Sequence, residues 1–135
     1  MLTSSKCMEP VIAYRGSRFT VEFAIRIDGS VPGLEFFNQL QERWQARLLV
    51  LFKLLGDTGR INNKEQFRKF SGEFFEFKAF QNRMPCYYRP DKRVVITHGF
   101  IKKKEGAAPK VESERAETIQ KEYEGRISSS DWGRR

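Results

Sequence analysis

The stretch FFEFKAFQNRMPCYYRPDKRVVITHGFI at residues 74–101 decides the predicted fold of this chain. Its three aromatic and β-branched runs, at 74–80, 84–88 and 93–101, are typical of strands. Short polar connections separate the runs, and connections of this length join antiparallel neighbours. We therefore predict an antiparallel sheet. Because Pro85 cannot donate a backbone hydrogen bond, we expect the middle run at a sheet edge or at a bulge.

The sequence before this stretch predicts one more strand and a long helical segment. Residues 18–27 alternate apolar and polar side chains, which is typical of a half-buried strand. From 34 to 55, apolar residues recur every three or four positions along two lines, so one bent helix or a tight helical hairpin would satisfy them. Pro32 suits the first turn of that segment, and Gly56 suits a C-terminal cap. We also expect an extra helical turn at 64–70.

After the sheet, the sequence predicts a helix that begins at Pro109 and runs to about Tyr123. Its apolar line, Val111, Ile119 and Tyr123, is thin, which indicates a helix that packs weakly or waits for a partner. The predicted fold class is α+β: a small, mainly antiparallel twisted sheet with an N-terminal helical hairpin and a C-terminal helix.

The chain length indicates a single domain. A chain of 135 residues has room for one hydrophobic core, and 12 Phe support a folded globule rather than a disordered chain. We place the domain at 16–125. Residues 1–15 are expected to be a poorly ordered lead or an extra strand, and residues 126–135 a disordered tail.

The net charge of +8 is concentrated in one part of the chain. Residues 60–104 carry 12 Lys and Arg against 4 Asp and Glu, whereas the flanking segments are nearly neutral. A basic surface of this kind attracts a polyanion and raises its rate of encounter. An RNA-directed protein with an acidic regulator would have this pattern, and so would a basic sheet that is merely solvated.

Several kinds of site are absent from the sequence. One His and two distant cysteines, Cys7 and Cys86, make no metal-ligand set, and we expect free thiols in a reducing cytosol. The phosphate-binding pattern GxxxxGK[ST], the dinucleotide pattern GxGxxG and the hydrolase pattern GxSxG do not occur. The longest apolar run, at 48–52, is too short to span a bilayer, and the N-terminus lacks the apolar core of a secretory signal. We therefore expect a cytoplasmic protein without metal, cofactor or membrane partner, whose catalysis, if any, uses Lys and Arg.

RNA cleavage is a reaction that cations can catalyse. The 2′-hydroxyl of RNA can attack the neighbouring phosphate, so the protein has to align the attack, help remove a proton and stabilise negative charge. Fixed cations do the last of these well, and acid–base assistance adds about 10²–10⁴-fold.

Several motifs resemble the RelE/HigB superfamily of type II toxin–antitoxin toxins. They are F74-F-E-F-K78, then Arg83, then V94-V-I-T-H-G-F-I-K-K-K104, and Pro109 at the start of a helix. The closest branch is the phage-derived HigB-like group, and the resemblance spans roughly residues 19–124. It implies a RelE-like toxin that cuts mRNA, typically in association with the ribosome, and so inhibits translation. It also implies a cognate antitoxin, expected to be a small helix-turn-helix DNA-binding protein encoded beside this gene.

The resemblance also implies the site residues. Lys78 stands where the family usually has an Arg, so the cation is kept but the planar guanidinium is lost. Arg83 matches the Arg of the next strand. These two residues and the lysines after the His-containing strand would form a cationic cleft, with Glu76 or His98 transferring protons. The full catalytic set is Lys78, Arg83, Lys102, Lys103, Glu76 and His98, and the expected RNA contacts are Lys104, Arg89, Arg93 and Tyr87.

Other interpretations of these residues remain open. The lysines at 102–104 could be a solvated strand end, and His98 could be a buried structural residue. Glu76 and Lys78 could form a surface ion pair, and Arg83 could be solvated at a hairpin. Two other functions also remain open: a ParE-like toxin that inhibits DNA gyrase without nuclease activity, and a non-catalytic, phage-derived nucleic-acid-binding module.

Overall fold

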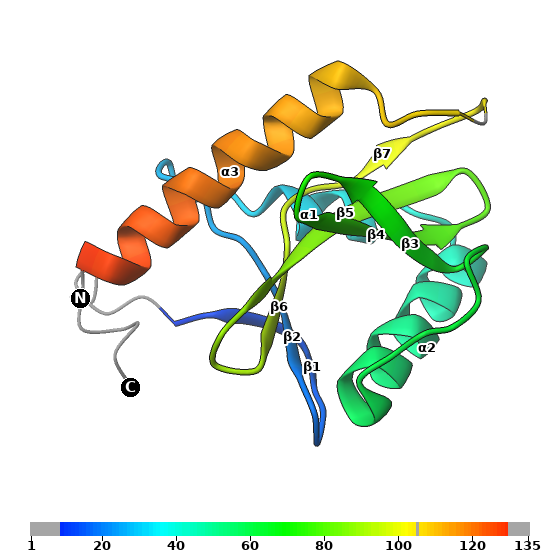
Figure 1. The fold of residues 1–135 in the computed structure, drawn as a ribbon, viewed down its shortest axis with the longest axis horizontal. Coiled ribbons are helices and arrows are strands. Elements are labelled where there is room, and N and C mark those ends of the chain that lie inside the picture. The colour runs from blue at the N-terminus through cyan, green and yellow to red at the C-terminus, as the bar shows by residue number, and fades with distance from the viewer. Residues whose placement is uncertain (1–8, 105, 130–135) are drawn as a thin grey trace.

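The computed structural model describes residues 9–104 and 106–129, and it has a sheet covered by helices on both faces (Figure 1). The strands lie in the order β1-β2-β6-β5-β4-β3, with β7 also paired to β5. Every pair is antiparallel except β2 with β6. The α+β class is therefore confirmed, with a mixed and largely antiparallel sheet. The strands are β1 (Val11–Arg15), β2 (Thr20–Phe23), β3 (Phe67–Ser71), β4 (Phe74–Ala79), β5 (Asn82–Arg89), β6 (Arg93–Ile96) and β7 (Phe100–Ile101), and the helices are α1 (Pro32–Asn38), α2 (Glu42–Thr58) and α3 (Lys110–Ser129).

The helical segment is two helices, α1 and α2, separated by residues 39–41. It is not N-terminal, because β1 and β2 precede it. Residues 11–15 form the extra strand that was one of the two expectations for the lead, whereas residues 1–8 lie outside the described part of the chain. The element order thus differs from the expected one by the strands β1 and β3 and by the division of the last expected strand into β6 and β7.

The two faces of the sheet bury separate apolar clusters. One cluster packs beneath α1 and α2 and includes Phe52 and Phe77. The other packs beneath α3 and includes Tyr87 and Tyr123. Cys86 is buried as a free thiol, and burial raises its pKa; Cys7 lies outside the described residues. Because both faces are covered, even the polar Glu22 of β2 and Glu76 of β4 are buried, so β2 is not the half-buried strand that its alternating pattern predicted.

The extra helical turn expected at 64–70 is wrong, because residues 67–71 form the edge strand β3. Phe67 and Phe70 are three residues apart, which on a helix would place them on one face. On this strand they enter the two opposite apolar clusters. A register shift between Lys69 and Ser71 further disturbs the strand pattern.

Gly56 is not the cap of α2. That role belongs to Gly59, which has the left-handed φ of 83° and whose N–H donates to the carbonyl of Leu55 at 2.9 Å. Gly56 is instead a contact point: a Cβ there would lie 2.7 Å from the ring of Tyr14. The turn between β1 and β2 can therefore pack directly on α2.

Pro85 lies in a central strand, so of the two expected positions the edge is wrong; like a residue at a bulge, Pro85 faces an irregular stretch of its neighbour, residues 97–99. Its carbonyl accepts a hydrogen bond from the N–H of Thr97 at 2.9 Å. The single strand predicted at 93–101 is two strands: β6 ends at Ile96, and β7 begins at Phe100. Because the N and O of one strand residue face the same neighbour, the missing N–H of Pro85 points toward the gap between β6 and β7.

The C-terminal helix packs more extensively than expected. Val111 is 59% exposed and contributes nothing to the core. The other two residues of the predicted line, Ile119 and Tyr123, are buried, and Ala116 and Ile127 extend the line at helical spacing. The helix includes residues 126–129 of the segment expected to be a tail, and residues 130–135 lie outside the described part. No helix in the described part is long and apolar enough to cross a membrane.

Candidate active site

A polar hollow of about 210 Å³ opens on the α3 side of the sheet, where β3 and β4 meet the loop that leads into α3. Four charged residues line it, and three of them concern the site: Arg68 from β3, Glu76 from β4 and Lys102 directly after β7. We call it the basic pocket. Its remaining lining comes from Lys69, Phe70, Gly106, Ala107 and Ala108.

Strand register places the predicted charges on one face of the sheet. Glu76 lies opposite Arg68 on β3, and Lys78 lies opposite Arg83 on β5. Directly opposed residues point to the same face, as do residues two apart on a strand. The structure therefore brings Glu76, Lys78 and Arg83 together. All three are buried, at 2%, 4% and 2% exposure, so Arg83 is not solvated at the hairpin.

The buried carboxylate of Glu76 accepts a side-chain hydrogen bond through only one of its two oxygens within the described part of the structure. Its Oε2 accepts a hydrogen bond of 3.0 Å from Nε of Arg68. Its Oε1 lies 3.9 Å from Nε of Arg83, and this buried oxygen accepts no hydrogen bond within the described part of the structure. Arg83 is fixed by a 2.5 Å hydrogen bond from Nη1 to the carbonyl of Phe80. A buried carboxylate oxygen without a donor costs free energy, which is a feature of sites that perform chemistry.

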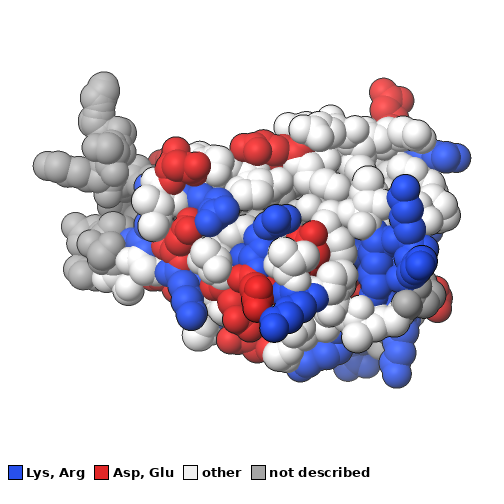
Figure 2. All heavy atoms as spheres, turned by 90° about the horizontal axis from the view of Figure 1, so that it is seen from above, with Lys and Arg blue, Asp and Glu red and all other residues white. Residues whose placement is uncertain are grey.

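Lys102 organises the loop at the entrance of the pocket. Its Nζ donates to the carbonyl of Gly106 at 2.7 Å, and its backbone N–H donates to the carbonyl of Gln81 at 2.8 Å. Lys103 and Lys104 follow it and are exposed. Figure 2 views the molecule from the α3 side and shows Lys and Arg gathered at its right-hand end, where β7 lies in Figure 1. Lysines at 102–104 are therefore well placed to meet a polyanion.

His98 is buried, and both of its ring nitrogens are in use. Nδ1 lies 2.9 Å from the hydroxyl of Thr97, and Nε2 lies 3.0 Å from Oε1 of Glu112 in the first turn of α3. Burial lowers the pKa of His98 to about 4, an effect that Glu112 opposes. This geometry matches the buried structural histidine that was one of the two interpretations, and it joins β6 to α3.

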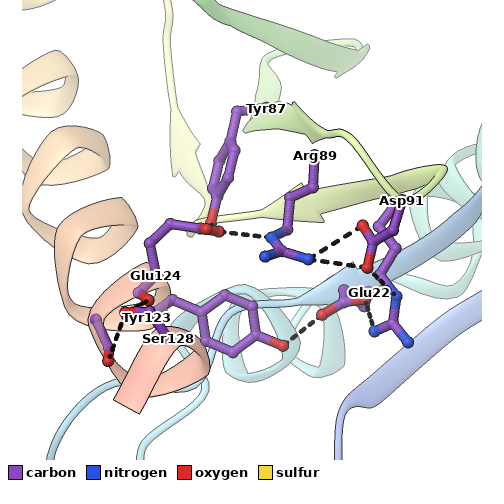
Figure 3. A network of polar contacts seen from close by, with 9 residues as sticks. Glu22, Tyr87, Arg89, Asp91, Tyr123, Glu124 and Ser128 are labelled. Carbon is purple, nitrogen blue, oxygen red and sulfur yellow. Dashed lines mark hydrogen bonds and ion pairs between the residues drawn. The ribbon is translucent and has the colours of Figure 1, made fainter. Parts of the chain in front are cut away.

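Three of the expected RNA contacts lie away from the basic pocket, beneath the C-terminal half of α3 (Figure 3). The hydroxyl of Tyr87 donates to Oε2 of Glu124 at 2.6 Å, and Arg89 donates to the same oxygen at 2.8 Å. Arg93 donates to the buried Glu22 at 2.6 Å. Burial, with the hydrogen bond to Glu124, raises the pKa of Tyr87 far above its ordinary value. Three more residues complete the network. Asp91 forms ion pairs with both arginines. Tyr123 donates a hydrogen bond to Glu22, and Ser128 donates one to the backbone carbonyl of Glu124.

Sequence reasoning missed Arg68, which contacts Glu76 and lines the basic pocket. It was hidden because residues 64–70 were assigned to a helical turn. The signal that could have revealed it is the Ser71-Gly72 pair between two aromatic runs, which is typical of a hairpin. Gly72 has the left-handed φ of 55° that such a turn requires.

Most of the chain matches a known protein family. The family model described as "Phage derived protein Gp49-like (DUF891)" matches residues 35–121, which include every residue that lines the basic pocket. No curated protein matches the chain. Within the described residues, no three His, Cys, Asp or Glu side chains are grouped so that they could hold a metal ion.

Proposed function

Because this chain belongs to the phage-derived Gp49-like family, we propose that it is the toxin of a type II toxin–antitoxin system and cleaves mRNA. Gp49-like proteins are commonly toxin-like and related to RelE/HigB. The observation that carries the proposal is the buried Glu76, which lines a pocket bordered by Arg68 and Lys102 and whose Oε1 accepts no hydrogen bond within the described residues. A base must offer a free lone pair within reach of the proton that it removes.

In the proposed reaction the scissile phosphate occupies the basic pocket, with its anionic oxygens toward Arg68 and Lys102. Oε1 of Glu76 takes the proton of the 2′-hydroxyl as the 2′-oxygen attacks phosphorus. The bond to the 5′-oxygen breaks, and that oxygen takes a proton from water. The products are a 2′,3′-cyclic phosphate and a 5′-hydroxyl, and Glu76 returns its proton to solvent.

Two further cations support this chemistry from below the pocket. Lys78 and Arg83 are buried side by side on the same face of the sheet as Glu76. Their positions are fixed by the sheet, so their charges need no rearrangement when negative charge builds up on the phosphate. Preorganised charge of this kind is often the largest single contribution to catalysis.

The proposed partners follow from the same surface. The substrate is mRNA, taken in the cytoplasm and on the ribosome, and the regulator is an antitoxin with a helix-turn-helix DNA-binding part. Inhibition by acidic residues that cover the basic pocket fits the structure better than displacement of α3. That helix is tied to the sheet by the pairs His98–Glu112, Arg26–Glu122 and Arg89–Glu124.

Induction in bacteria and assay of the purified protein test the proposal together. We expect growth arrest on induction, and cleavage of mRNA on programmed ribosomes. Intact ribosome-bound mRNA together with normal growth would contradict the proposal. Intact mRNA with accumulating DNA breaks would instead identify a gyrase inhibitor of the ParE type.

A further inference from the structure

A second and larger hollow, of about 530 Å³, lies on the opposite side of the sheet, near the C-terminal end of α2. Three aromatic residues form its floor: Phe67 from β3, Phe75 from β4 and Tyr88 from β5. We call it the aromatic pocket. Its size is within the range of ligand-binding clefts, about 300–1,000 Å³. The other lining residues are Gly59, Arg60, Ile61, Asn62, Lys64, Arg68 and Lys69.

The three aromatic rings lie next to one another, two of them parallel and the third edge-on. Phe67 and Phe75 are stacked, with centroids 5.5 Å apart and planes 2° apart, and Tyr88 meets Phe75 edge-on at 5.6 Å. Phe67 is buried and belongs to the core, whereas Tyr88 is 36% exposed. Nζ of Lys69 lies 5.0 Å from the centroid of Phe75, over its ring. A flat ring face next to a mobile, exposed cation suits a nucleobase and its phosphate.

The charge around the aromatic pocket has a single sign. Arg60, Lys64 and Lys69 are exposed at its border, and Arg68 also lines it. No Asp or Glu lines it within the described part of the chain. A pocket for a neutral apolar ligand or for an uncharged segment of another protein has no need of four cations, whereas a polyanion does.

The aromatic pocket and the basic pocket meet at one edge strand, β3. Arg68 and Lys69 line both hollows. They lie on β3, which is the last strand of the sheet, so no further strand separates the two faces beyond it. A single-stranded chain can therefore pass from one pocket to the other over this edge.

We propose that the aromatic pocket is an RNA subsite, in which a base flanking the cleaved bond stacks on Tyr88 and Phe75. The inference rests on the proposed cleavage of RNA in the basic pocket and adds to it where the neighbouring nucleotide goes. Arg68 and Lys69 hold the phosphates at the β3 edge. Because every base has a flat face, stacking tolerates any sequence and mainly raises affinity.

Binding of labelled RNA oligonucleotides with single abasic positions tests this subsite. Binding is measured by fluorescence anisotropy in the E76Q background, which prevents cleavage during the titration. With Tyr88 present, we expect one abasic position to weaken binding about tenfold, as loss of one stacked base does. In Tyr88→Leu, intact RNA should bind about tenfold more weakly, and the same abasic position should cause no further loss.

Two controls keep the test decisive. Phe80→Leu removes an aromatic ring that is 64% exposed and stacks on Trp44, outside both pockets, so the abasic penalty should remain. Lys64→Gln changes an exposed side chain at the border and should weaken binding of intact RNA even if Tyr88→Leu does not fold.

The outcomes separate this inference from the proposed function. An abasic penalty that persists in Tyr88→Leu, with active cleavage by the unaltered protein, would overturn the subsite alone. Loss of the penalty in Tyr88→Leu without any cleavage by the unaltered protein would support the subsite and overturn the nuclease. Absence of RNA binding by every variant would overturn the subsite, whereas the nuclease is decided separately by cleavage on programmed ribosomes.

Discussion

At the scale of single residues, the first prediction concerns Glu76, whose buried Oε1 accepts no hydrogen bond within the described residues. Glu76→Gln keeps the size and the contact with Arg68 but removes the base. We expect kcat for RNA cleavage to fall by about 10²–10⁴-fold, with little change in KM. Glu73→Gln, in the exposed turn before β4, is the matched control and should leave kcat unchanged. A Glu76→Gln protein that cleaves within tenfold of the normal rate would show that another group takes the proton.

His98 leads to a prediction on pH. The pKa of His98 is about 4 in the folded protein and near 6.5 in the unfolded chain. Between these values the unfolded chain binds a proton that the folded protein does not, so the free energy of unfolding falls as pH is lowered. Above 6.5 His98 adds no pH dependence. Glu112 and Arg115 on α3 and Arg26 from the sheet side act on the same ring.

Urea unfolding across this pH range measures the effect, and His98→Gln isolates it because the chain has one His. The unaltered protein should lose stability more steeply than the variant as pH falls. Equal slopes for the two proteins would mean that His98 titrates normally in the fold.

The strand pattern alone predicted only the part of the site that lies on one unbroken strand, whereas Arg83 and Lys102, on other elements, were predicted from the resemblance. Glu76 and Lys78 are two residues apart, so the period of two placed them on one face. Arg89, Arg93 and Tyr87 could not be placed, because their partners Glu22 and Glu124 are distant in sequence. Charge and local pattern do not show which cation is neutralised by a remote carboxylate.

At the scale of the elements, the segment between β6 and β7 packs closely against α1 at Gly99, which has no side chain. A Cβ at Gly99 would lie 2.1 Å from the ring of Phe36 on the α1 segment. Overpacking of this kind typically costs about 1–3 kcal/mol, so Gly99→Ala should lower the free energy of unfolding by about 2 kcal/mol or more.

Gly125→Ala is the matched control. Gly125 lies within α3, and nothing would stand within 4 Å of a Cβ there. Alanine is the better helix former, so this change should raise the free energy of unfolding by about 0.5–1 kcal/mol. Urea unfolding of both variants checks the pair. A neutral Gly99→Ala would show that α1 is free to move away from β7.

The elements with a long, regular hydrophobic pattern were predictable. Those whose residues pack against two different parts of the molecule were not. The strand around β2, the helical segment, β4 and α3 all follow their periodicity. β3 was missed because its Phe67 and Phe70 enter opposite cores. The cap of α2 was misplaced by three residues because Gly56 serves a contact instead. In both places, contacts with distant parts of the chain decide the structure, and local sequence preferences alone predict a different one.

At the scale of the whole molecule, the segregated charge predicts the salt dependence of RNA binding. Replacing Lys103 and Lys104 by Glu should weaken RNA binding. The slope of log affinity against log salt should fall by at least about 0.7 for each phosphate that the protein no longer neutralises. Lys110→Glu with Lys121→Glu makes the same charge change on the exposed side of α3 and should have a smaller effect. Equal weakening in the two proteins would mean that only net charge matters.

Cleavage of two ribosome-bound mRNAs that differ by one oxygen atom tests the central claim most directly. The first is ordinary RNA, used to map the cut, and the second carries a 2′-deoxynucleotide on the 5′ side of that cut. If Glu76 activates the 2′-hydroxyl, the protein will cut the first, leave a 5′-hydroxyl on the downstream fragment and leave the second intact. Cutting of the deoxy-substituted mRNA at the same position and rate would contradict this chemistry.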